Sequence, residues 1–232
     1  MARTGFLHHI GTFLLFAATV LLIITCISSP VVRHLSILRV DYRNTADSSV
    51  SFGTFGYCLN NVGNGGCSKS HVGYRPADVM TSIEQTQFSD YSRSTTKILT
   101  RVMILHPIAC GLNFIAFLLA AGAGVVGSFL ASVVALVAFL TTVVIMIIDF
   151  VLFSIIRSNV NDDRTNSHAH YGAAAWTILV AAICSLLGTI IVFFTCCSAR
   201  LHKRRNRDTT VKHEYVQDGY APPATRTRRR WF

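Results

Sequence analysis

Two cysteines, Cys58 and Cys67, stand nine positions apart in a polar, glycine-rich stretch of the sequence. Their spacing fits a disulfide, or a metal site to which His71 would add a third ligand. Structural zinc sites have four protein ligands and this stretch offers no fourth, so a disulfide is the prediction, with two free thiols as the alternative. A disulfide requires Cα atoms within about 7 Å of each other and an oxidising compartment.

The residues around the two cysteines predict the elements that would hold them together. Residues 50–55 alternate between two faces with period two, which is typical of a strand. Residues 60–66 read N-N-V-G-N-G-G, and glycine and asparagine favour tight turns because they tolerate positive φ. We therefore predict two short strands that are joined by a turn, closed by the disulfide and placed outside the cell.

The rest of the sequence has the composition of a membrane protein: 51% of the residues are hydrophobic, 14% are charged, and the mean hydropathy is +0.47. Four apolar segments are long enough to cross a bilayer, which takes about 20 residues. The predicted fold class is a mainly α membrane protein, with a four-transmembrane-helix bundle and a small disulfide-stapled extracellular β-sheet. The predicted segments are a cytoplasmic N-terminus (1–6), four spans (7–29, 100–121, 125–149 and 172–197), a first extracellular loop (30–99), a short cytoplasmic turn (122–124), a second extracellular loop (150–171) and a basic, disordered cytoplasmic tail (198–232).

Several features of these segments have competing interpretations. The first apolar run could be a signal peptide cleaved near Ser29, but it is long for one, and the following loop would still emerge outside. We predict that His106 is an interfacial residue bonded to a neighbour and that Asp149 is an interfacial acid near Arg157. A functional site inside the membrane is the alternative for both. Residues 76–88 predict an amphipathic helix whose apolar side packs on the sheet.

The positive charge is concentrated at one end of the chain. The formal net charge is +10, and the residues from Arg200 onward contribute +7 of it. A basic segment directly after an apolar span is typical of a cytoplasmic tail on anionic lipid, so we expect cytoplasmic termini and no nucleic-acid partner. Cys196 and Cys197, at the same boundary, are candidate palmitoylation sites. The predicted lipid-binding residues are Arg200, Lys203, Arg204, Arg205 and Arg207.

The motif F-G-T-F-G-Y-C, followed by C-S and V-G-Y, resembles the signature of the fungal Sur–PalI family. The resemblance covers the four spans and the first loop, residues 6–200. It implies a claudin-like, four-span protein of the plasma membrane, of the kind found in eisosomes and in the alkaline-pH response. Claudins carry a tryptophan before their two cysteines, where this chain has F-G-Y. The residues that carry the resemblance are Phe52, Gly53, Phe55, Gly56, Tyr57, Cys58, Cys67, Ser68, Gly73 and Tyr74.

The sequence contains no catalytic motif that we recognise, so we expect a protein that is not an enzyme and that needs no cofactor or metal. The resemblance implies an organising or scaffold protein that associates laterally with itself, with lipids or with other integral membrane proteins. An accessory subunit of an ambient-pH signalling complex of the PalI type is the alternative. A channel or transporter is a third hypothesis, which only His106 and Asp149 support. No small-molecule substrate is evident.

Overall fold

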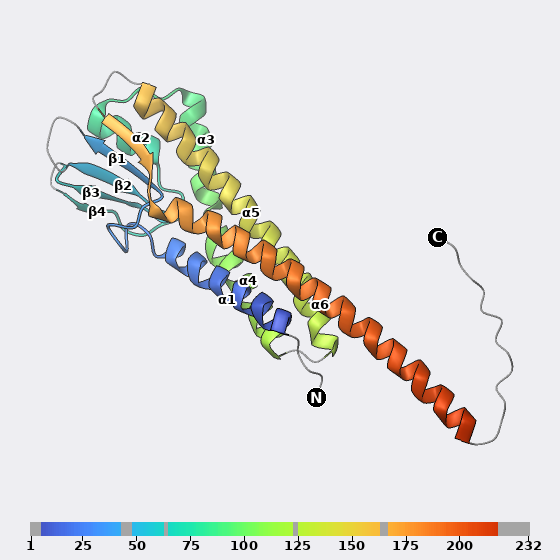
Figure 1. Cartoon of the computed structure of the whole chain (residues 1–232). Helices are drawn as coiled ribbons and strands as arrows, with labels where there is room; N and C mark the ends of the chain where they lie inside the picture. The colour runs from blue at the N-terminus through green and yellow to red at the C-terminus, as the bar shows by residue number, and fades with distance from the viewer. Residues whose placement is uncertain (1–5, 43–47, 63–64, 123–124, 163–166, 218–232) are drawn as a thin grey trace.

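The computed structural model describes residues 6–42, 48–62, 65–122, 125–162 and 167–217. Figure 1 shows a bundle of long helices with a β-sheet at one end, while the last turns of one helix project beyond the other end. The elements in chain order are α1 (Phe6–Cys26), β1 (Leu38–Tyr42), β2 (Ser49–Phe52), β3 (Tyr57–Asn60), β4 (Gly66–Cys67), α2 (Pro76–Glu84), α3 (Asp90–Val102), α4 (Leu105–Gly122), α5 (Val125–Asp162), β5 (Ser167–Tyr171) and α6 (Ala173–Gln217).

Four helical segments are long and apolar enough to cross a membrane: Phe6–Cys26, Asp90–Gly122, Phe129–Asp162 and Ala173–Cys196. Exposed apolar residues line α1, α4, α5 and the part of α6 up to Phe194, which suits helices that are buried in lipid rather than exposed to water. The helices pack as a ring, in which α1 and α5 each contact both α4 and α6. This arrangement confirms the predicted four-helix bundle.

Glycine allows α1 and α6 to approach each other closely. A Cβ atom added at Gly11 would lie 2.9 Å from Cγ2 of Ile191, and one added at Gly188 would lie 3.0 Å from Cγ of Leu15. Because a larger residue would force the two helices apart, the two glycines set their spacing.

The exposed side chains of α5 mark where the hydrocarbon ends. Exposed apolar residues run along the helix from Phe129 to Val151, and the next exposed positions on that face are Ser154 and Ser158. The 22 residue steps from Phe129 to Val151 correspond to about 33 Å of helix, close to the thickness of a bilayer core. The outer boundary therefore lies between Val151 and Ser154, at about the level of the exposed Trp176 at the start of α6.

The outer domain is a five-stranded sheet with the order β4-β3-β2-β1-β5, in which all neighbours are antiparallel. Strands β1 to β4 come from the first loop, whereas β5 comes from the second. Along their shared ladder, Leu38 lies opposite Tyr171 and Tyr42 lies opposite Ser167. The two outer loops therefore form one sheet, although 124 residues separate the end of β1 from the start of β5.

The core of the outer domain forms where the sheet packs against the upper part of α5. Leu38, Val40, Val50 and Phe52 of the sheet are buried together with Phe153 and other residues of α5. Met80 of α2 and Phe88 beyond it join this core, so the amphipathic segment packs on the sheet as predicted. The α5 residues of this core are Leu152, Phe153, Ile156 and Val160.

The end of α5 differs from the prediction, because the apolar content of the sequence does not show where this helix ends. Segment 150–171 was expected to be a loop, but α5 continues to Asp162 and β5 follows. The buried positions 153, 156 and 160 recur at helical spacing and pack on the sheet, which stabilises a helix among polar neighbours. The predicted second span, 100–121, lies within the candidate span Asp90–Gly122, in which α3 ends at Val102 and α4 begins at Leu105.

The prediction of disorder for the tail 198–232 is also wrong as far as Gln217, because α6 extends to that residue. Residues 198–217 contain no glycine or proline, and their lysines and arginines are good helix formers, so nothing in the sequence ends the helix at the membrane surface. Residues 218–232 lie outside the described residues.

The disulfide should stabilise the outer domain by about 2–3 kcal/mol, because it limits the freedom of the unfolded loop. Limited proteolysis of protein in vesicles tests this: Cys58→Ser/Cys67→Ser should be cut within residues 30–99 at much lower protease concentration than the wild type. The spans should remain protected, because their backbone hydrogen bonds are internal. Cys184→Ala is the matched control, since it removes a free thiol from α6. Identical cleavage of the double variant and the wild type would contradict a stabilising role.

Candidate functional site

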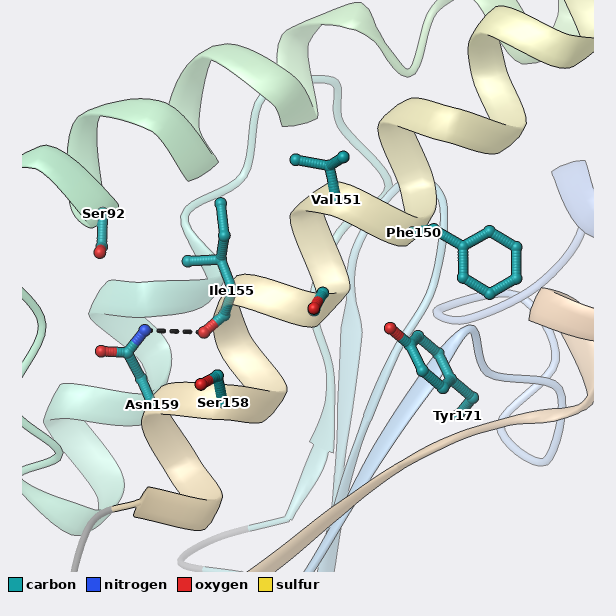
Figure 2. A pocket seen from close by; sticks show the side chains of 8 residues that line it. Ser92, Phe150, Val151, Ile155, Ser158, Asn159 and Tyr171 are labelled. Atoms are coloured by element: carbon teal, nitrogen blue, oxygen red, sulfur yellow. Dashed lines mark hydrogen bonds between the residues drawn. The ribbon is translucent and has the colours of Figure 1, made fainter.

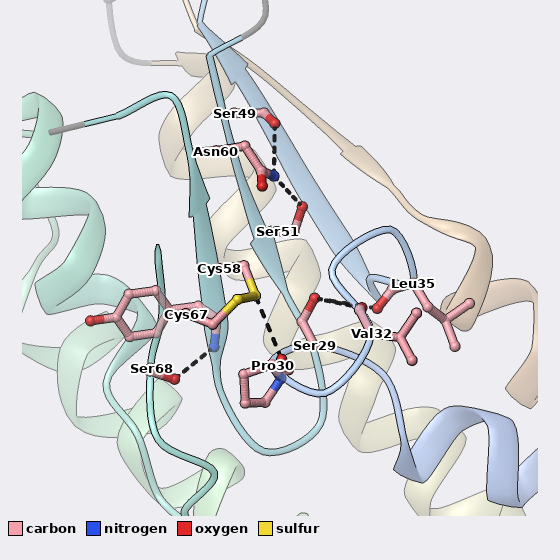
Figure 3. The surroundings of a disulfide bond; sticks show 11 residues. Ser29, Pro30, Val32, Leu35, Ser49, Ser51, Cys58, Asn60, Cys67 and Ser68 are labelled. Carbon is pink, nitrogen blue, oxygen red and sulfur yellow. Dashed lines mark hydrogen bonds between the residues drawn. A yellow bond between two sulfur atoms is a disulfide. The ribbon is translucent and has the colours of Figure 1, made fainter. Parts of the chain in front are cut away.

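Cys58 and Cys67 form a disulfide between β3 and β4, where they lie directly opposite each other with Cα atoms 4.0 Å apart. Figure 3 shows the bond beside Pro30 and Ser68, below the Asn60 side chain, which donates to Ser49 and Ser51 of the neighbouring strand. The disulfide prediction is confirmed. Among the described residues, no group of three or more His, Cys, Asp or Glu side chains could hold a metal ion.

The motif residues lie mostly inside the protein, where they attach the sheet to the outer end of α1. Thr54 Oγ1 donates to the carbonyl of Thr25 at 2.9 Å, and the Thr54 N–H donates to Ser28 Oγ at 3.0 Å. A Cβ atom at Gly53 would overlap the backbone of Ser29, so only glycine permits this approach. Residues 52–58 of the motif therefore hold the sheet on the bundle, whereas the exposed part of this loop includes Gly65, Gly66 and Cys67 and continues to Val72.

Tyr74, at the end of the motif, connects the motif to α3. Its hydroxyl donates to the carbonyl of Gly53 at 2.7 Å, and its own carbonyl accepts from Thr100 Oγ1 at 2.8 Å. Burial raises the pKa of the Tyr74 hydroxyl well above its ordinary value, and the charge of Asp149 raises it further. Tyr74 therefore serves as a neutral hydrogen-bond donor. Of the other motif residues, Gly73 has a φ of +79°, which favours glycine.

His106 and Asp149 form a buried pair at the junction of the outer domain and the spans. His106 Nε2 lies 3.0 Å from Asp149 Oδ2, and the two side chains are 1% and 2% exposed. The pair corrects the prediction that Asp149 is an interfacial acid near Arg157. That guanidinium instead lies over the Tyr171 ring and donates from Nε to the carbonyl of Ala169. Oδ1 of Asp149 has no hydrogen-bond partner among the described residues.

Pro107 explains why His106 is placed in this way. A proline in a helix has no N–H, and its ring clashes with the carbonyl four residues earlier, which here belongs to Met103. The chain accordingly breaks between α3 and α4. The carbonyl of Met103 accepts instead from the backbone N–H and from Nδ1 of His106, both at 3.1 Å. The pairing of His106 with Asp149 could not be identified from the sequence, because the two residues lie 43 positions apart.

A second polar cluster lies about 10 Å deeper, seven residues further along α4 and seven residues earlier along α5. Asn113 Nδ2 donates to Thr142 Oγ1 at 3.2 Å, and Asn113 Oδ1 accepts from Ser185 Oγ at 3.0 Å. All three side chains are fully buried. This cluster joins α4, α5 and α6 by hydrogen bonds that lipid cannot replace, so it fixes how the helices pack.

An open groove of about 590 Å³ runs along α5 at the outer boundary. Figure 2 shows Ser92 of α3 on one side of it and Tyr171 on the other, with α5 as its floor. The lining has apolar and uncharged polar groups but no charged residue. Its members are Ser92, Phe150, Val151, Ser154, Ile155, Ser158, Asn159 and Tyr171.

The predicted palmitoylation and lipid-binding residues lie near the other end of the bundle, on α6. Cys196 is only 3% exposed, so its thiol lies inside the protein and is poorly placed for acylation. The side chain of Cys197 lies outside the described residues, as do those of the predicted lipid-binding residues Arg200, Lys203, Arg204, Arg205 and Arg207. Their backbone belongs to α6.

Comparison with known proteins gives relatives that are similar in sequence to parts of this chain. The pH-response regulator protein palI/prr-5 of Neurospora crassa is 34% identical over 107 residues, which cover 46% of this chain and 14% of that protein. The pH-response regulator protein palI/RIM9 of Emericella nidulans is 31% identical over 112 residues, or 48% of this chain and 18% of the relative. The uncharacterized membrane protein TOS7 of Saccharomyces cerevisiae is 25% identical over 219 residues, or 88% and 34%.

This chain therefore corresponds to only about a seventh to a third of the length of these relatives. The model of one family, described as the SUR7/PalI family, matches residues 7–201, which include all four spans and the whole outer domain. The chain is a multi-pass membrane protein that belongs to the SUR7/PalI family.

Proposed function

We propose that this chain is a non-catalytic subunit of an ambient-pH response at the plasma membrane, which acts by associating laterally with other membrane proteins. The observation that carries the proposal is the similarity of 30–34% identity to three proteins that are named pH-response regulators. The similarity covers 45–48% of this chain. The extension of the pH-response role from that part to the whole protein is therefore part of the proposal.

The form of the molecule supports lateral association. The outer sheet and the upper part of α5 share one core, so a partner that binds the outer domain would also be linked to the spans. The groove on α5 offers apolar surface and uncharged hydrogen-bonding side chains at the level where a neighbouring membrane protein would lie. Partner proteins, lipids and further copies of the chain are all candidates for this contact.

The buried polar groups give less support to a channel or transporter. Asn113, Thr142 and Ser185 bond to one another or to backbone carbonyls, as expected for side chains that hold helices together. Only Asp149 has an unpaired side-chain oxygen among the buried, described groups of the spans. An organising role within eisosomes, without a link to pH, is the alternative that the experiment below distinguishes.

Cells that lack this protein should grow poorly at alkaline pH, and the wild-type gene should restore growth. Proximity labelling from a fusion of a biotin ligase to the full chain should then mark other membrane proteins of the ambient-pH response. The ligase fused to an unrelated four-span protein is the control for general membrane neighbours. Normal growth at alkaline pH, with eisosome proteins as the labelled neighbours, would contradict the pH role and favour the organising one.

Both termini should be cytoplasmic and residues 31–99 outside. Figure 1 shows the disulfide-bonded sheet and the basic end of α6 at opposite ends of the molecule, so the two should lie on opposite sides of the membrane. An impermeant maleimide added to intact cells should label a cysteine introduced at the exposed Lys69 and miss one introduced at Ser198, relative to the parent protein. Labelling at position 198 without permeabilisation would reverse this orientation.

The start of the cytoplasmic part of α6 should bind anionic lipid. Positions 200, 203, 204 and 207 share one helix face, and they begin about 6 Å beyond Cys196. Basic residues this close to the surface contribute about 1 kcal/mol each. Native mass spectrometry should show that phosphatidylserine copurifies with the wild type and is largely lost when the five predicted lipid-binding residues become glutamine. The matched control changes Arg226, Arg228, Arg229 and Arg230, and equal loss in both variants would contradict a local site.

A further inference from the structure

The His106–Asp149 pair has a proton requirement that follows from its contacts. His106 Nδ1 lies 3.1 Å from a carbonyl oxygen, and Nε2 lies 3.0 Å from a carboxylate oxygen. A neutral imidazole has one N–H and one bare nitrogen, so it can donate to only one of these two oxygens. Both contacts are hydrogen bonds only if the ring is doubly protonated or if Asp149 carries a proton. An arrangement in which both contacts are hydrogen bonds therefore needs one proton more than a neutral histidine beside a carboxylate.

Loss of that proton leaves two acceptors facing each other at hydrogen-bond distance. If Nδ1 keeps its hydrogen, the bare Nε2 faces the Asp149 carboxylate, and if Nε2 takes it, the bare Nδ1 faces the carbonyl of Met103. Either arrangement removes one hydrogen bond and leaves a buried carboxylate whose other oxygen is already unpaired. Such unpaired buried groups are costly, so one of the two contacts has to open.

Among the titratable groups near Asp149, the His106–Asp149 pair is the main site for the additional proton. Two titratable groups whose charges interact with Asp149 are Tyr74 of the outer domain and Cys26 of α1, and Cys26 also interacts with Cys110 of α4. All three are neutral acids when protonated, and none is a cation that could compensate the carboxylate. Among the described residues, no lysine or arginine forms an ion pair with Asp149.

The pair is placed where it could respond to the pH outside the cell. Asp149 lies two residues before Val151, or about 3 Å along the helix from the inner side of the outer boundary between Val151 and Ser154. Its partner His106 is bonded to Met103, whose side chain belongs to the core of the outer domain. A change in the backbone position at the break between α3 and α4 would therefore affect the packing of both the sheet and α5.

A chain of contacts extends from this break to the motif. Thr100, one turn before Met103, donates to the carbonyl of Tyr74, whose hydroxyl donates to the carbonyl of Gly53. Met103 N–H in turn donates to the carbonyl of Thr100 at 3.4 Å. The contacts of one buried pair are therefore linked to the residues that attach the sheet to α1.

We infer that His106 and Asp149 form a buried single-proton site at the outer end of the bundle, whose occupancy sets the fit between the outer domain and the spans. The protonated pair holds the α3–α4 break against α5, and loss of the proton at alkaline pH loosens that break. The inference rests on the proposed role in the ambient-pH response and gives that role a physical receptor for the proton.

Asp149→Asn provides a sharp test, because it should lock the protonated arrangement. The asparagine amide can donate to Nε2 of a neutral His106, while Nδ1–H still donates to Met103, so no additional proton is needed. The measurement is amide hydrogen exchange of residues 100–108 in the full-length protein in nanodiscs at about pH 6 and about pH 9. Protection factors correct for the intrinsic effect of pH on exchange.

The wild type should lose protection in residues 100–108 by about tenfold or more at the higher pH, because a charge-assisted hydrogen bond is lost. Asp149→Asn should stay within about twofold, which is well below that loss. The matched control is Asp41→Asn, which alters a half-buried aspartate that lies 3.5 Å from His170 in the outer sheet. It should behave like the wild type. Constant protection in the wild type, or a loss in Asp149→Asn equal to that of the wild type, would overturn the inference.

A second measurement covers the case in which Asp149→Asn is not recovered from membranes. In the wild type, the ring ¹⁵N shifts of His106 report whether the imidazole is doubly protonated, and infrared bands report whether the Asp149 carboxyl group carries a proton. Together they detect the additional proton on either residue. One proton should leave the pair in the same pH interval in which residues 100–108 lose protection, and no change in that interval would overturn the inference. Both readouts use purified protein, so their result is separate from the growth test of the proposed function.

Discussion

Lipid offers no hydrogen bonds, so each polar side chain that enters the bundle has to find a partner within the protein. Most threonines of the spans meet this requirement by donating to a carbonyl one turn earlier in their own helix, as Thr19 and Thr141 do. Asn113 needs more partners and obtains them from two other helices. Asp149 is the most demanding group, because it is ionisable and only one of its oxygens is paired. The positions of α4 and α5 relative to each other follow from these pairings.

The same two helices also decide the position of the outer domain. Helix α5 leaves the hydrocarbon near Val151 and continues to Asp162, where its apolar face becomes the support for the sheet. The ladder between β1 and β5 then closes the structure, since it joins the chain after α1 to the chain before α6. A small sheet with one face in water would be marginal alone. Here the disulfide, the contacts of Thr54 and the α5 face all hold it to the spans.

Local patterns made the four spans, the turn between the cysteines and the amphipathic helix predictable from the sequence. The Cys58–Cys67 pairing followed from the same kind of evidence, because both cysteines lie in one short polar segment. Strand β5 was not predictable, since S-H-A-H-Y has little strand character and becomes a strand only because β1 is available as a neighbour. The end of α5 was missed for a related reason. Its polar last turns are stabilised by packing on the sheet, and the sequence does not show that the sheet lies beside them.

The candidate site illustrates the same limit at the level of single residues. His106 and Asp149 were both noticed as unusual residues of the spans. His106 was expected to bond to a neighbour, as it does, but the partner of Asp149 was predicted wrongly, because 43 positions of chain separate the two residues. The cause of their meeting is nevertheless local, and it is Pro107. By preventing a continuous helix, the proline turns α3 towards the sheet and leaves the Met103 carbonyl for the His106 ring. A histidine held in this way presents Nε2 to α5, where the acid lies. The break between α3 and α4 and the placement of the buried pair therefore both depend on Pro107, which is the structural reason to expect that the outer domain and the pair are coupled.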